Sequence, residues 1–216
     1  NTSTLDFTVT LSADGSADLK GATTVWGQGA PEYRRSFQSA GARKATFEQQ
    51  WAQSFPGLSV SQLTVSDTTR LEEPMKLEFQ MHAPRYAEVL PLGLRFFPLG
   101  SGRAFTQVLA PLSERKSDAV FPGVWVNRFT VRYEVPAGYG LQTVPEPFDE
   151  SSDFGRARLS VSVEGGKPVV TGEVAMAKAR IKASEYPKFR AWLLRVDQAF
   201  SRKLTVLTQG NQSARR

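Results

Sequence analysis

An alternation of apolar and polar side chains with a period of two residues is the feature that most constrains this chain. Every second residue from Leu5 to Leu11 is apolar, and an equivalent pattern returns between Leu19 and Trp26. Successive side chains of a β-strand point to opposite faces, so the alternation indicates strands with one buried face. The intervening Asp14-Gly15 predicts a hairpin turn in which Gly15 adopts a positive φ.

The same strand pattern recurs along the rest of the sequence. Further strands are predicted at residues 58–65, 75–81, 128–135, 159–163, 169–181 and 204–207. Gly165-Gly166 predicts a tight hairpin, and no segment shows the strand–helix–strand order that builds a parallel sheet. The expected fold class is therefore mainly β or α+β, built from antiparallel sheets.

A few helices are expected beside the strands. Pro31 suits the first turn of a short helix, and a second helix follows in which Phe47, Trp51 and Phe55 lie four residues apart. A third helix is expected after Ser184, which is a suitable capping residue. Its apolar positions fall on a single stripe of about 100°, and they are Phe189, Trp192, Leu193, Val196 and Phe200. This pattern predicts an amphipathic C-terminal helix, followed by a polar tail at 209–216.

A proline-rich segment at 84–121 predicts a connection between two halves of the protein. It includes Gly100-Ser101-Gly102, which lacks the third glycine of a dinucleotide-binding loop and is interpreted as a turn. We place the boundary near residue 90. The expected organisation is a β-rich domain with two short helices at 1–90 and a β-sandwich-like domain with the C-terminal helix at 91–216.

Positive charge is concentrated at the C-terminal end. The net charge is +6, and ten Lys and Arg residues follow Met176 against two acids. Phe189 and Trp192 lie on the apolar stripe of the expected helix, so these cations are expected on a solvated surface and no nucleic-acid partner is predicted. An acidic envelope polymer or an anionic membrane surface is the alternative. No apolar run approaches the roughly 20 residues of a transmembrane helix.

The residue types present restrict the chemistry. The sequence has no cysteine and one histidine, His82, which excludes thiolate nucleophiles and multi-histidine metal sites within one molecule. The acidic stretch 146–153 does not have the spacing of a calcium-binding EF-hand loop. We therefore expect a non-enzyme without cofactor or metal; a hydrolase that uses two facing carboxylates is the alternative.

Exposed aromatic residues are the candidate ligand contacts. Trp26, Trp51, Trp125 and Tyr139 could form a platform for a carbohydrate, with core packing as the alternative for each. Trp125 lies next to the turn that follows Pro122, and Tyr139 lies in a predicted turn after Pro136. These positions make Trp125 and Tyr139 the surface candidates for ligand binding.

Several segments in the second half of the sequence resemble those of a known family. They are Arg115-Lys116, a strand ending in Val135-Pro136-Ala137-Gly138-Tyr139, the segment 141–145, and the segment 181–190 before the amphipathic helix. Together they resemble the uncharacterised domain that follows the transglutaminase-like domain in large exported bacterial proteins. The first half is similar to the strand-rich piece that commonly precedes that domain.

The resemblance implies a role rather than a reaction. It implies a non-catalytic accessory region, secreted to the periplasm or the cell surface, that docks on or presents substrate to the upstream transglutaminase-like domain of the same polypeptide. Any Cys-His-Asp machinery would belong to that upstream domain. The alternative is an independent module that binds a cell-envelope polymer or glycan.

Overall fold

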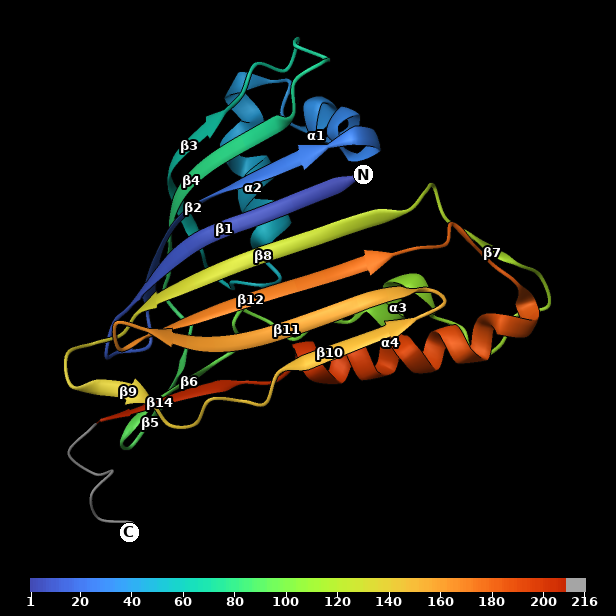
Figure 1. Ribbon diagram of the computed structural model, residues 1–216. Coiled ribbons are helices and arrows are strands. Elements are labelled where there is room, and N and C mark those ends of the chain that lie inside the picture. The colour runs from blue at the N-terminus through green and yellow to red at the C-terminus, as the bar shows by residue number, and fades with distance from the viewer. Residues whose placement is uncertain (209–216) are drawn as a thin grey trace.

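A large twisted sheet organises the molecule. The computed structural model describes residues 1–208, and its main sheet has eight strands in the order β10-β11-β12-β8-β1-β2-β4-β3 (Figure 1). The strands are β1 (Thr2–Leu11), β2 (Ala17–Trp26), β3 (Ser59–Val65), β4 (Met75–Ala83), β8 (Trp125–Glu134), β10 (Phe148–Ser152), β11 (Gly155–Glu164) and β12 (Lys167–Met176). Neighbouring strands are antiparallel except for the central pair, β1 and β8, which is parallel. The predicted β-rich, antiparallel class is confirmed.

Two smaller sheets complete the β-structure. One has the order β5-β6-β14-β9 and lies at one end of the large sheet, and the other pairs β7 with β13 (Figure 1). Their strands are β5 (Glu88–Leu90), β6 (Gly93–Phe96), β7 (Ala119–Val120), β9 (Tyr139–Leu141), β13 (Arg180–Ile181) and β14 (Leu204–Thr208). The strand predicted at 169–181 is thus two strands, because β12 ends at Met176 and the backbone then turns to pair with β7.

The helices include the predicted amphipathic one. They are α1 (Ala30–Ser36), α2 (Arg43–Trp51), α3 (Phe105–Leu109) and α4 (Tyr186–Phe200). All five predicted apolar positions of α4 are buried, as the stripe requires. The prediction that Ser184 caps this helix is wrong. Ser184 lies inside a short 3₁₀ turn before α4, and Glu185 accepts the backbone N–H of Lys182 there.

All four helices lie on one face of the large sheet and form two groups (Figure 1). The core under α1 and α2 contains Phe37, Phe47 and Phe79, whereas the core under α4 contains Phe189 and Trp192. These side chains are almost fully buried, and each contributes about 1.5–3 kcal/mol of hydrophobic stabilisation. The sheet therefore carries two hydrophobic clusters side by side on its covered face.

The opposite face of the sheet is open and polar. Arg128 and Arg132 of β8 point to this face, as their alternation with the buried Val131 requires. Arg132 forms an ion pair with Asp6 of β1, and Arg128 forms one with Glu173 of β12 at 2.7 Å. Opposite charges on neighbouring strands stabilise such a face by a few tenths of a kcal/mol to about 1 kcal/mol per pair.

Strands from both halves of the sequence share the large sheet. β1 pairs with β8 from Thr2 opposite Val126 to Thr10 opposite Glu134, so the central seam joins residues more than 120 positions apart. The domain division near residue 90 stays a prediction. The structure adds that the segments on either side of it meet along a parallel pair of strands.

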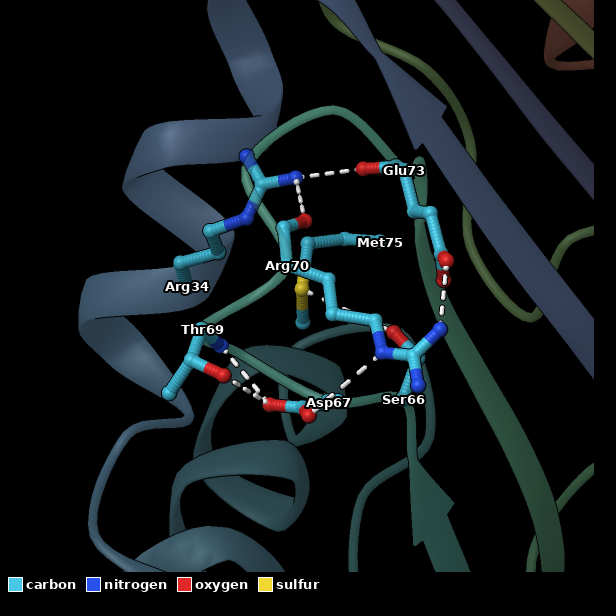
Figure 2. Close-up of polar contacts among 7 residues, drawn as sticks. All are labelled: Arg34, Ser66, Asp67, Thr69, Arg70, Glu73 and Met75. Atoms are coloured by element: carbon cyan, nitrogen blue, oxygen red, sulfur yellow. Dashed lines mark hydrogen bonds and ion pairs between the residues drawn. The ribbon is translucent and has the colours of Figure 1, made fainter.

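The long loop between β3 and β4 is held against α1 by one buried arginine. Figure 2 shows Arg34 reaching from α1 to this loop, where its Nη2 donates to the carbonyls of Arg70 and Glu73. The same nitrogen also donates to the carbonyl of Leu71 at 3.1 Å. Within the loop, Arg70 is also paired with Asp67 at 3.7 Å. Because the carbonyls receive donors inside the protein, the loop and α1 are fixed relative to each other.

Candidate functional site

A groove of about 450 Å³ lies on the covered face, between the two groups of helices. Its volume is within the range of ligand-binding pockets. The floor is formed by β1, β2, β8 and β12, and it includes Leu5, Thr23, Asn127, Phe129 and Val174. Phe129 packs against both hydrophobic clusters, which places the groove at their seam. We refer to this feature as the seam groove.

The floor depends on a close approach between Phe129 and a glycine. Gly172 of β12 lies opposite Phe129 in the strand register, and a Cβ at this position would lie 2.3 Å from the Phe129 ring. No side chain tolerates such a contact without displacement. Gly172 therefore allows the aromatic ring to lie flat across the neighbouring strand.

One wall of the seam groove is aromatic and comes from α1 and α2. Phe47 and Trp51 lie one helical turn apart, with ring centroids 5.7 Å from each other, and Phe55 stacks on Trp51 at 5.5 Å. Residues four apart share a helix face, which brings Phe47 and Trp51 together. Phe55, predicted in the same helix, lies beyond its end at Trp51, in a turn, and the backbone N–H of Phe55 donates to the Trp51 carbonyl. Tyr33 of α1 extends the wall, and burial raises the pKa of its phenol.

The other wall begins in a segment that two buried tyrosines hold in place. The hydroxyl of Tyr133 donates to the carbonyl of Pro98 at 2.9 Å, and it lies 2.9 Å from the hydroxyl of Tyr86. Two residues later Gly100 adopts φ 77°, and a Cβ there would lie 2.2 Å from the Phe55 ring. The turn at 100–102 thus docks directly against the aromatic wall.

Helix α4 then positions Arg103 and the start of α3. The backbone N–H of Arg103 donates to Ser201 Oγ at 3.1 Å. Asp197 accepts the backbone N–H groups of Phe105 at 2.6 Å and Thr106 at 3.0 Å, which satisfies the free donors of the first turn of α3. These contacts set Arg103 and Phe105 along the second wall, together with Phe200 of α4.

Arg103 brings an uncompensated positive charge to the seam groove. Its side chain has no hydrogen-bond or ion-pair partner within residues 1–208, whereas the side chain of Arg128 points to the open face and is bound by Glu173. Burial lowers the pKa of the Arg103 guanidinium, yet an arginine stays protonated at neutral pH. The Arg103 side chain is partly buried and has no acid beside it, so this site favours an incoming anion.

Two amide side chains add further polar groups to the groove. Asn127 Oδ1 accepts the hydroxyl of Ser3 at 2.6 Å, which leaves the amide nitrogen of Asn127 directed away from this bond and able to donate. Gln50 of α2 lines the same groove. The seam groove therefore combines aromatic walls with a cation and amide donors, an arrangement suited to a ligand with apolar groups and hydrogen-bond acceptors.

Two hollows on the open face are less suited to a ligand. They measure about 530 and 600 Å³ and are lined largely by polar side chains. Asp6 borders one and is paired with Arg132, while Asp149 borders the other and is paired with Arg158 at 3.3 Å. The acids Asp6 and Asp149 of the open face are thus already compensated by their neighbours.

The two surface candidates from the sequence lie in different places. Trp125 begins β8 and packs against the cluster under α4, whereas Tyr139 lies in β9 and packs against the cluster under α2. Both side chains are partly buried. Their role in ligand binding stays a prediction. Of the aromatic residues considered from the sequence, Trp51 is the one that lines the seam groove.

His82 lies on the open face, away from the seam groove. Its Nδ1 is 2.8 Å from Asp18 Oδ1, and Ser59 lies opposite His82 in the register of β3 and β4. Asp18, His82 and Ser59 thus lie in the order of a catalytic triad, but the His82 and Asp18 side chains are 48% and 76% exposed. Such solvated side chains form an ordinary cross-strand pair, because activation of a nucleophile needs a shielded and oriented base.

Half of the eight described cations that follow Met176 are paired with local acids. These ion pairs join Lys178 to Glu185, Arg180 to Asp118, Arg195 to Glu150 and Lys203 to Glu88. The partner of Arg195 belongs to the acidic stretch 146–153, in which Asp149 is also paired with an arginine, Arg156. Within residues 1–208 no group of three or more potential metal ligands occurs, and no helix is long and apolar enough to cross a membrane. The predicted tail at 209–216 lies outside the described residues.

Sequence reasoning missed Arg103, Gln50 and Asn127. They come from three distant parts of the sequence and converge only in the folded molecule. The one local signal was a basic residue, Arg103, directly after the turn Gly100-Ser101-Gly102, in a segment interpreted as a connection between two halves. That signal is too common in loops to identify a site.

Comparison with known proteins identifies a family for the second half. A family model described as a domain of unknown function with a solved structure, DUF3858, matches residues 94–206. No curated protein matches this sequence. Among solved structures, the protein is similar to a candidate protease from Parabacteroides distasonis ATCC 8503, with 20% identity and a TM-score of 0.40. That similarity covers 44% of this chain and 19% of the other.

Proposed function

The chain belongs to the DUF3858 family, and we propose that it is a non-catalytic interaction region of a larger exported protein. In this proposal it docks on, or presents substrate to, a transglutaminase-like domain upstream in the same polypeptide, in the periplasm or at the cell surface. The observation that carries the proposal is the seam groove with its unpaired Arg103. The sequence resemblance at 115–145 and 181–190 supports the transglutaminase link, and both segments fall within the family match.

The chemistry of the seam groove is that of binding. Phe47 and Trp51 offer apolar contact area, and Arg103 offers hydrogen-bond donors that no residue of 1–208 uses. General acid–base catalysis works best with a group whose pKa lies near the working pH. Tyr33 lines the groove, but burial moves its pKa further above neutrality. The groove is therefore better suited to holding a segment than to transferring a proton.

The walls of the groove are held rigidly before any ligand arrives. Arg34 fixes α1 to the β3–β4 loop on one side, and Asp197 fixes the first turn of α3 on the other. A preformed site loses little conformational entropy on binding, which increases affinity. This rigidity supports a docking role, because the groove keeps its shape without a partner.

A glycan or envelope polymer is the second candidate ligand. Trp51 together with the amide groups of Gln50 and Asn127 favours it, since sugars stack on aromatic rings and hydrogen-bond through hydroxyl groups. The local ion pairs of the C-terminal third direct this alternative to the seam groove rather than to the basic surface.

The proposal can be tested by blocking the groove. This region and the portion of its parent polypeptide that precedes it would be expressed separately and titrated by calorimetry. Saturable binding is expected, and Gln50→Trp should abolish it by filling the groove. Gln49→Trp is the matched control, because Gln49 is an exposed neighbour on the same helix that does not line the groove.

Two outcomes would contradict the docking role. One is the absence of saturable binding between folded partners, and the other is equal affinity for the Gln50 and Gln49 variants. Binding of cell-wall glycan fragments that Gln50→Trp alone removes would instead favour the second candidate.

A further inference from the structure

We propose that the seam groove recognises a peptide segment in which a carboxylate lies beside bulky apolar side chains, with Arg103 as the carboxylate contact. This inference rests on the proposed docking function and specifies the chemistry of the docked segment. The anion would come from an acidic side chain of that segment.

The charge of the groove selects an anion. The side chain of Arg103 has no acidic or hydrogen-bonding partner within residues 1–208, and the described residues that line the groove include no Asp or Glu. A guanidinium presents a planar fork of donors that matches a carboxylate with two parallel hydrogen bonds. The surroundings are partly desolvated, so such a pair is stronger here than on an open surface.

The walls of the groove select what accompanies the anion. Trp51 and Phe47 face the groove from one side, while Phe105 and Phe200 face it from the other. Apolar side chains on the docked segment would bury their surface against these rings. A free phosphate or a purely polyanionic polymer would leave the aromatic walls without contacts, which favours an acidic and apolar peptide.

The amide groups of Gln50 and Asn127 are suited to the backbone of such a segment. Each amide can donate to a peptide carbonyl and accept from a peptide N–H. They lie on different elements, α2 and β8, so a segment along the groove can contact both walls and the floor. A peptide is therefore a better match than an isolated fatty acid, which offers acceptors at one end only.

Arg103 has a signature that separates a binding residue from a structural one. A partly buried charge without a partner adds no ion pair to the stability of the empty fold, so Arg103→Met should leave the melting temperature of the free protein unchanged or raise it. The same substitution should weaken peptide binding by about tenfold or more, because hydrogen bonds to charged groups are the stronger ones. Arg103→Lys keeps the charge but loses the fork, and an intermediate affinity is expected.

The experiment uses two end-capped tripeptides as probes, Phe-Glu-Phe and its neutral counterpart Phe-Gln-Phe, titrated against the full protein by calorimetry. The acidic peptide should bind at least about tenfold more tightly than the neutral one. Arg103→Met should remove this discrimination. Gln50→Glu should remove it as well, since the new carboxylate would place a negative charge in the groove, whereas the control Gln49→Glu should retain it.

The results separate this inference from the docking function. Equal affinity for the two peptides, or discrimination that survives Arg103→Met, would overturn the carboxylate contact. If the upstream portion binds and Gln50→Trp blocks it while Arg103→Met does not weaken it, docking stands and this inference fails. If the protein binds the acidic peptide more tightly than the neutral one but does not bind the upstream portion, the inference stands and docking fails. If the Arg103→Met variant does not fold, the inference is tested by whether Gln50→Glu loses the preference for the acidic peptide while Gln49→Glu retains it.

Discussion

Removal of the Asp197 carboxylate should loosen one wall of the seam groove. Asp197 accepts two backbone N–H groups at the start of α3, from Phe105 at 2.6 Å and from Thr106 at 3.0 Å. Thr106 is buried, so its N–H could not easily turn to water after the carboxylate is lost. The substitution Asp197→Ala therefore leaves orphaned donors as well as removing a helix cap.

The magnitude follows from these two contacts. Loss of an N-cap costs about 0.5–2 kcal/mol, and a hydrogen bond to a charged group contributes about 1.5–3 kcal/mol. We expect Asp197→Ala to lower the free energy of unfolding by about 2–3 kcal/mol, because both contacts are lost together. Asp197→Asn keeps one acceptor oxygen and should cost about half as much. For a protein of this size the alanine variant should melt about 4–12 °C lower.

Urea unfolding, followed by tryptophan fluorescence, would measure the change in free energy, with thermal melts as a second readout. The control is Asp6→Ala, which removes an exposed carboxylate paired with Arg132 on the open face and should cost less than about 1 kcal/mol. An Asp197→Ala variant within about 0.5 kcal/mol of the parent protein would refute the capping role. Equal stability of the asparagine variant and the parent would show that charge is not involved.

Three further predictions concern the elements that shape the groove. Burial raises the pKa of the phenols of Tyr86 and Tyr133 above the ordinary value of 10.0, so unfolding releases protons at high pH. The free energy of unfolding should therefore fall as the pH rises above about 10, by up to about 1.4 kcal/mol per pH unit for each tyrosine. Urea midpoints should show a shallower alkaline loss in the Tyr86→Phe/Tyr133→Phe double variant, and an unchanged slope would contradict the assignment. Arg34→Met should cost about 1–3 kcal/mol and speed proteolysis within the β3–β4 loop, whereas an unaltered cleavage pattern would show that the carbonyl contacts do not hold that loop. Gly172→Ala should cost about 1–3 kcal/mol by displacing the Phe129 ring, and a melting temperature equal to that of the parent protein would argue against the close packing.

Local patterns in the sequence were sufficient for the elements themselves. The alternation from Leu5 to Leu11 predicted β1, and the stripe from Phe189 to Phe200 predicted α4, because each pattern reports which side of an element must be buried. Positive φ values at Gly15 and Gly165 agree with the predicted turns. Where the prediction failed, a neighbouring element made the difference, as when pairing with β7 separated β13 from β12.

Such local patterns could not predict the candidate site. Arg103 lies in a segment whose prolines and glycines indicated only a connection. Its place in a wall depends on Ser201 and Asp197, which lie more than 90 residues further along the sequence. A contact of this kind leaves no periodic trace in either segment, because each partner satisfies its own local rules without the other.

The sequence by itself determined that this protein forms amphipathic strands and helices with few chemically reactive groups, since side-chain period and residue type are local properties. Only the tertiary structure decided that β1 and β8 lie side by side, with Leu5 opposite Phe129, and that the groove follows their seam. The physical reason is that burial of an apolar face is non-directional. It requires that each strand cover its apolar side, and the packing of the whole molecule then selects which distant strand becomes its neighbour.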